Sequence, residues 1–129
     1  MLEQGALTKR LIGLAIDVHE IVGHEIVGPG LLESVYQECL CLELTDAGIP
    51  FQSQAMVPVI YKGRTIPLEF RADIIVADAV IVEIKAVIVL VPAHEAQILI
   101  YLRMSHIRVG LLLNFHARRL KDGLRRFII

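Results

Sequence analysis

The sequence predicts an α/β protein with a mixed central sheet flanked by helices. Two amphipathic stretches near the amino terminus have helical spacing, and three apolar runs of strand length follow them. A third helical stretch then precedes a last, continuously apolar run. Because a helix that follows a β-meander usually returns the chain to the same sheet, we expect the order α-α-β-β-β-α-β, with helices packed on the sheet.

Length and composition favour one domain, residues 1–129. The 129 residues suffice for one hydrophobic core and are too few for two. The mean hydropathy is high at +0.61, but the central charge-free stretch 86–93 is far shorter than the roughly 18–20 apolar residues of a membrane span. The amino-terminal stretch is amphipathic and lacks the pattern of a signal peptide. We therefore expect a cytoplasmic protein without a membrane partner, and a homo-oligomer, in the first instance a dimer, whose interface covers the excess apolar surface.

Charge is distributed unevenly along the chain. The net charge is −1, which argues against a general polyanion binder. From Arg103 onward seven basic residues accompany only Asp122, a net of +6, whereas the preceding part has six basic and thirteen acidic residues, a net of −7. The basic part could follow phosphate groups, or it could be a solvated tail that keeps an oily protein soluble. Cys39 and Cys41 are too close for an ordinary disulfide, so we expect two free thiols in a reducing compartment.

The helices are expected from apolar periodicity and from Gly and Pro. Helical spacing predicts a first helix over residues 8–22 and a second over 31–47, where Gly48 and Pro50 follow the helix end. Pro92 predicts the start of a third helix, over 93–104.

The strands are expected from runs of β-branched and apolar residues. They predict strands over 51–61, 65–76, 80–89 and 108–115, the last of them buried and central, with a turn at 62–64. Pro67 places its strand, or that end of it, at a sheet edge. Residues 120–129 fit either a short helix or an edge strand.

A pentapeptide, HEIVG, occurs twice in tandem, at His19–Gly23 and His24–Gly28. Five residues advance a helix by about 500°, so the two copies cannot present the same face to the core. We expect one copy to continue the first helix and the other to form an extended connection. The spacing is not the HExxH of zinc proteases, so no metal site is expected here.

Three ionisable residues, Asp73, Glu83 and Lys85, interrupt two apolar β-like runs. Burying such groups costs several kcal/mol unless they are paired or bind a metal. Strand alternation places Glu83 and Lys85 on the same face. If the turn is centred on Asp78, residues equidistant from it pair and Asp73 faces Glu83. A register shifted by one residue would send the two acids to opposite faces.

Facing carboxylates repel each other unless a positive group lies between them. A divalent cation such as Mg²⁺, which prefers oxygen ligands, meets that need. Lys85 could then orient or deprotonate a water, or stabilise charge on a phosphoryl group. The alternative is a satisfied buried ion-pair cluster without chemistry.

These residues resemble a known family. Arg71-Ala-Asp73 with Val82-Glu83-Ile84-Lys85 resembles the D-x(n)-E-x-K signature of the PD-(D/E)xK nuclease superfamily, and Gly30–Tyr36 matches the motif of its GxxExxY branch. Pro92–Gln97 and Gly110–Phe115 extend the resemblance over nearly the whole chain. It implies a restriction-endonuclease-like αβββαβ core with an extra N-terminal helix.

The resemblance also implies site roles. Asp73 and Glu83 would be metal ligands, Lys85 the catalytic lysine, Glu33 a further acid from the second helix, and Gln97 a partner of Lys85 or of the phosphate. The implied cofactor is Mg²⁺ or Mn²⁺, and the implied partner is nucleic acid, with DNA favoured over RNA.

Other readings of single residues stay open. Glu33 suits the start of a helix whatever the function, and Tyr36 could either bond it or lie in the core. His94 fits a helix start better than a base, Tyr101 fits packing, and Arg71 could pair with an acid or with a phosphate.

The expected function is thus metal-dependent phosphodiester hydrolysis of nucleic acid. The alternative is a non-catalytic nuclease-fold module that dimerises or binds nucleic acid through its basic carboxyl-terminal part. Two departures from the family pattern bear on this choice: the duplicated HEIVG precedes the Glu33 motif, and Val87–Val91 is wholly apolar, which favours a buried interface there.

Overall fold

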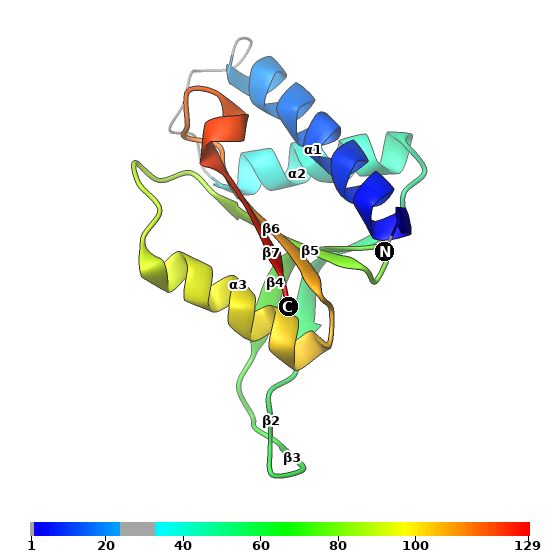
Figure 1. Cartoon of the computed structure of the whole chain (residues 1–129), viewed down its shortest axis with the longest axis vertical. Helices are drawn as coiled ribbons and strands as arrows, with labels where there is room; N and C mark the ends of the chain where they lie inside the picture. Colours follow the sequence, from blue (N-terminus) through cyan, green and yellow to red (C-terminus); the bar gives the residue numbers. More distant parts are fainter. Residues whose placement is uncertain (1, 24–32) are drawn as a thin grey trace.

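The structure, a computed structural model, describes residues 2–23 and 33–129. Two helices open the chain and are followed by three strands and a small hairpin. A third helix then leads into the last strands (Figure 1). The elements in order are α1 (Leu2–Val22), α2 (Glu33–Asp46), β1 (Phe51–Val57), β2 (Ile60–Tyr61), β3 (Arg64–Thr65), β4 (Phe70–Val76), β5 (Val80–Lys85), α3 (Pro92–Ser105), β6 (Val109–Asn114), the 3₁₀ helix η2 (Leu120–Gly123) and β7 (Leu124–Ile128).

A five-stranded mixed sheet in the order β1-β4-β5-β6-β7 forms the centre of the molecule. Neighbouring strands are antiparallel except for β5 and β6, which are parallel and connected through α3. Helices α1 and α2 lie on one side of the sheet and α3 on the other (Figure 1), and each side has its own apolar core. The α/β fold class with a helix-flanked mixed sheet is therefore confirmed, and β6 is a fully buried interior strand between β5 and β7.

The helices match the expected ones with shifted boundaries. The first begins at Leu2 rather than at residue 8, and it buries Leu11, Ala15 and Val18 against the sheet. The first HEIVG copy continues this helix to Val22, as expected of one copy; the second copy lies outside the described residues. Helix α2 ends at Asp46, and Gly48 follows with a φ of +70°, a conformation that glycine adopts without strain.

Two expected strands are each divided, and prolines explain why. Residues 51–61 form β1 and the separate β2, because Pro58 has no N–H to continue the ladder. Residues 65–76 likewise form β3 and β4, with Pro67 between them. The short β2–β3 hairpin extends away from the main sheet (Figure 1). The strand β4 is therefore not an edge strand: it lies between β1 and β5, and Pro67 precedes it.

The third expected strand ends four residues early, at Lys85 rather than at residue 89. The Asn114 side chain explains this end: its Oδ1 accepts from Val87 N at 3.0 Å and its Nδ2 donates to Val87 O at 2.9 Å. A side-chain amide thus takes the place of the next ladder residue. The apolar segment beyond it is exposed, with Ile88 at 88% and Val89 at 66% exposure.

Residues 120–129 contain both of the expected elements, a short helix and an edge strand. Residues Leu120–Gly123 form η2, and β7 is an edge strand antiparallel to β6. The two cysteines are free thiols, as expected, and burial raises the pKa of Cys41 to about 11. None of the described helices has the length and apolar character needed to cross a membrane.

Candidate active site

Asp73 and Glu83 face each other at the end of the β4–β5 ladder. The ladder pairs Val76 with Val80 and Ile74 with Val82, so residues equidistant from Asp78 pair, and the predicted register is confirmed. At the next position, Asp73 opposite Glu83, hydrogen bonds from the side chains replace those of the ladder. Asp73 N donates to Glu83 Oε1 at 2.9 Å, and Ile84 N donates to Asp73 Oδ2 at 2.7 Å. Each carboxylate is thus fixed by the backbone of the opposite strand.

Burial sets the protonation of this acid pair. Glu83 is only 2% exposed. Burial, and then the negative charge of Asp73, raise the pKa of Glu83 to about 8. The pKa of Asp73 is also raised, chiefly by burial, although the Ile84 N–H and the charge of Lys85 oppose the rise. Near neutral pH the pair therefore retains a proton that isolated carboxyls would have lost.

Lys85 lies two residues beyond Glu83 and is held by α3. Its Nζ donates to Gln97 Oε1 at 3.2 Å, and Gln97 Nε2 donates to Tyr101 Oη at 3.0 Å. Gln97 and Tyr101 are one helical turn apart on α3, so their hydrogen bonds form a short chain that fixes the position of the Lys85 ammonium group. Gln97 thus lies beside Lys85, as the resemblance implied. Tyr101 is buried, as expected for packing, but it also supports Gln97.

Glu33, the first residue of α2, reaches the end of β5. Its Oε2 accepts from Ala86 N at 3.1 Å, and its charge contributes to the raised pKa of Asp73. Tyr36, one turn later, is a core residue: it is 1% exposed and stacks on Phe115 with ring centroids 4.5 Å apart.

The acid pair has donors that fit a divalent metal ion. Hard cations prefer one or two carboxylates together with water and phosphate oxygens, and Asp73 and Glu83 provide two facing carboxylates. Within residues 2–23 and 33–129, however, no three His, Cys, Asp or Glu side chains are arranged closely enough to hold a metal. Glu33 therefore borders the pair rather than completing a closed three-ligand set.

Two glutamines that were not predicted to belong to the site support Asp73. Gln37 Nε2 donates to Asp73 O at 3.2 Å, and Gln54 Nε2 donates to Gln37 Oε1 at 3.0 Å. The β1–β4 ladder skips Gln54, which lies opposite Asp73 with a φ of +50°. The carbonyl of Asp73 is thereby left for Gln37. A signal existed: Gln37 is a polar residue at helical spacing from the buried Leu40, Cys41 and Leu44.

Two other residues near the site have structural partners. His94 Nδ1 accepts from Val91 N at 3.1 Å, which makes it a helix-start residue as expected. Arg71 lies 3.7 Å from Glu69, and both side chains are about half exposed or more. An apolar cavity of about 460 Å³ lies beside the Gln97–Tyr101 hydrogen bond. It is lined by these two residues and by Phe70, Ala93, His94, Ala96 and Ile100.

A family model described as the PD-(D/E)XK nuclease superfamily matches residues 5–127, nearly the whole chain. No curated protein and no solved structure gives a significant match. The chain belongs to the PD-(D/E)XK nuclease superfamily.

Proposed function

We propose that this protein hydrolyses phosphodiester bonds in nucleic acid, with DNA favoured over RNA, in a reaction that requires Mg²⁺ or Mn²⁺. The observation that carries the proposal is the buried Asp73–Glu83 pair, in which each carboxylate is held by the backbone of the opposite strand, close to a lysine that Gln97 of α3 holds in place. Membership of a nuclease superfamily supports the same reaction class. We further propose that the chain belongs to the GxxExxY branch, on the motif that contains Glu33 and Tyr36.

The site residues would divide the work as follows. Asp73 and Glu83 would hold the metal ion, with Glu33 close by, and lose their shared proton when it binds. The ion would supply Lewis-acid stabilisation of charge on the phosphoryl group. Lys85 would orient the attacking water or donate to a phosphoryl oxygen, since Gln97 and Tyr101 fix the position of its ammonium group.

A cleavage assay tests the proposal. Single-stranded, duplex and branched DNA, and RNA, are incubated with the protein in Mg²⁺ or Mn²⁺. We expect cleavage by the wild type and a loss of about a hundredfold or more in Lys85→Ala. Lys62→Ala is the matched control, because Lys62 is an exposed lysine in the β2–β3 turn. Cleavage that survives Lys85→Ala would show that another mechanism or a contaminant is responsible.

Metal binding is tested separately by calorimetry. Mg²⁺ is titrated into the wild type and into Asp73→Ala at a pH above 8, where Glu83 is ionised. We expect heat of binding in the wild type and its loss in the variant. Equal heats in both proteins, or none in either, would reject the metal site.

A second candidate is a non-catalytic nuclease-fold module that binds nucleic acid. One observation favours it: in the described part of the chain, Glu33 does not join the acid pair in a three-ligand metal cluster. Nucleic-acid binding by the wild type without cleavage of any substrate, in either metal, would support this candidate over the enzyme.

A further inference from the structure

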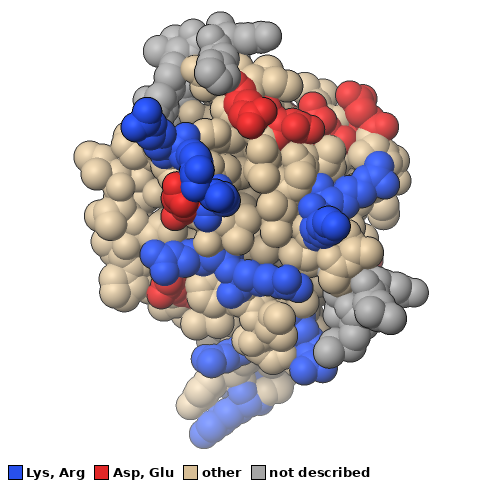
Figure 2. Space-filling model, turned by 45° about the horizontal axis from the view of Figure 1, so that its top comes forward, with Lys and Arg blue, Asp and Glu red and all other residues tan. Residues whose placement is uncertain are grey.

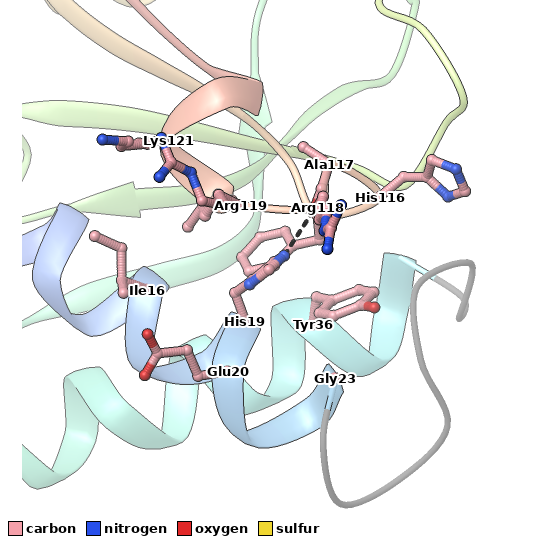
Figure 3. A pocket seen from close by; sticks show the side chains of 12 residues that line it. Ile16, His19, Glu20, Gly23, Tyr36, His116, Ala117, Arg118, Arg119 and Lys121 are labelled. Carbon is pink, nitrogen blue, oxygen red and sulfur yellow. Dashed lines mark hydrogen bonds between the residues drawn. The ribbon is translucent and has the colours of Figure 1, made fainter.

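A second cavity, of about 850 Å³, opens between α1, the start of α2 and the segment that joins β6 to η2 (Figure 3). This volume is within the range of small-ligand sites, roughly 300–1,000 Å³. Its walls come from Ile16, His19 and Glu20 on α1, from Tyr36 on α2, and from the segment Phe115–Lys121. The cavity contains none of the acid-pair residues, so the proposed hydrolysis does not account for it.

The lining of the cavity combines a largely apolar surface with three basic residues. Arg118, Arg119 and Lys121 are basic, and the only carboxylate among the lining residues of the described chain is Glu20. Arg119 lies 3.4 Å from Asp122, but both side chains are more than 60% exposed, so this ion pair is weak and leaves the guanidinium available. Arg118 and Lys121 form no ion pair within the described residues. Figure 2 shows several groups of Lys and Arg side chains on one face of the molecule, and most of the acidic side chains in this view lie along its upper part.

The backbone that carries these cations is fixed in place. His19 Nε2 donates to the carbonyl of Ala117 at 2.7 Å, and this bond joins α1 to the segment (Figure 3). Ala117 N donates to Asn114 O at 3.2 Å, and His116 N donates to Asn114 Oδ1 at 3.2 Å. At Gly123 a Cβ atom would lie only 2.5 Å from Asn114 O, so the segment is tightly folded. A basic segment held in this way loses little conformational entropy when it binds an anion.

The same segment begins at the candidate active site. Phe115 N donates to Lys85 O at 2.8 Å, and the Asn114 amide makes two hydrogen bonds to Val87. Tyr36, in the wall of the cavity, is one helical turn from Glu33, which contacts Ala86. The segment that lines the cavity is therefore hydrogen-bonded to the carboxyl-terminal end of β5, the strand that carries Glu83 and Lys85.

We propose that this cavity binds phosphate groups of a nucleic-acid strand through Arg118, Arg119 and Lys121. This inference rests on the proposed function, and it explains how a polyanion approaches a site whose own side chains are mainly acidic. Phosphate contacts position a strand without reading its sequence. The ligand is the backbone of the strand, and a free nucleotide is a separate outcome of the test.

The test is strand binding without hydrolysis. A fluorescent single-stranded DNA of about 15 nucleotides is titrated in EDTA, with fluorescence anisotropy as the readout, at several salt concentrations. We expect Arg118→Ala/Lys121→Ala to raise Kd about tenfold at low salt and to reduce the slope of log Kd against log salt by about 1.4, which corresponds to two lost phosphate contacts on a single strand.

The control variant is Lys9→Ala/Arg10→Ala, which removes the same charge from exposed positions on α1 that do not line the cavity. We expect its Kd to stay within about twofold of the wild type. Equal weakening by the two double variants would mean that binding follows net charge alone, and an unchanged Kd in Arg118→Ala/Lys121→Ala would remove the cavity from the binding surface. Either result overturns the inference.

Two further arms separate the possible failures. If the wild type cleaves no substrate but the cavity variant still loses strand binding, hydrolysis fails and the cavity inference stands. If the wild type cleaves and the cavity variant keeps the same Kd and KM, the inference fails and hydrolysis stands. Competition by a mononucleotide at the same phosphate concentration as the strand must be weak; competition of equal strength would assign the cavity to a free nucleotide and overturn the strand proposal.

Discussion

Replacing Glu83 with glutamine tests the electrostatics of the acid pair without an activity assay. Glutamine keeps an oxygen that can accept from Asp73 N, as Glu83 Oε1 does at 2.9 Å, but it cannot ionise. The wild-type carboxyl has a pKa of about 8 in the fold against 4.5 as its ordinary value. The variant therefore removes a titration and keeps the shape of the site.

The sign and size of the effect follow from proton linkage. Between pH 4.5 and about 8 the folded protein retains a proton on Glu83 that the unfolded chain has lost. Because the unfolded state binds fewer protons, the free energy of unfolding falls as pH rises through this window. One proton corresponds to a slope of at most about 1.4 kcal/mol per pH unit, so the whole window is worth up to about 5 kcal/mol. The raised pKa of Asp73 acts in the same direction.

The assay is urea unfolding of the wild type and Glu83→Gln in EDTA at pH 5, 6.5 and 8. We expect the wild type to lose several kcal/mol from pH 5 to pH 8 and the variant to lose clearly less, so that the variant is the more stable protein at pH 8. Mg²⁺ should stabilise the wild type more at pH 8 than at pH 5, because metal and proton compete for the same carboxylates. Parallel pH profiles for the two proteins would refute the proposed burial of a protonated Glu83.

Three other predictions concern different parts of the structure. Gln37→Ala removes the hydrogen bond to Asp73 O and should lower the free energy of unfolding by about 1–3 kcal/mol. It should also reduce kcat by a larger factor than it changes KM, whereas the control Gln52→Ala, at an exposed position, should change neither. Unchanged kinetics in Gln37→Ala would deny Gln37 a positioning role. Gly123→Ala forces a Cβ against Asn114 O and should cost about 1–3 kcal/mol in thermal unfolding, whereas an unchanged Tm would contradict the tight folding of that segment. The expected homodimer should dissociate in Ile88→Asp, measured by light scattering, if the exposed apolar segment after β5 is its interface; a monomeric wild type would reject the dimer.

Most of the fold could be predicted because its signals are local. Alternation and continuous apolar runs identified β5 and β6, and Pro92 identified the start of α3. The errors occurred where tertiary contacts end an element. Apolar character continues past Lys85, yet β5 stops there because Asn114, far along the chain, supplies the next hydrogen bonds to Val87. No pattern within residues 80–89 reports that contact.

The candidate site was predictable to the extent that one turn determines it. The position of Asp78 in the turn fixed which residue faces Glu83, and strand alternation placed Lys85 on the same side. The support of Asp73 was not predictable in this way, because Gln37 and Gln54 come from a helix and a strand that reach it only in the folded protein. The same limit applies to the cavity beside Arg118, Arg119 and Lys121, because the number of basic residues in the sequence does not show which of them line one cavity.

The contacts of Lys85 distinguish between the two interpretations that the sequence left open for the acids. In a satisfied ion-pair cluster the lysine would bond Asp73 or Glu83, and their pKa values would be low. Instead its Nζ bonds the neutral Gln97, no ion pair joins it to either acid in the described structure, and the pKa of both carboxyls is raised. A buried pair left in this state destabilises the fold above neutral pH, a cost that packing alone does not require. Binding of a cation would remove that cost, which supports the proposal that Asp73 and Glu83 hold a metal ion.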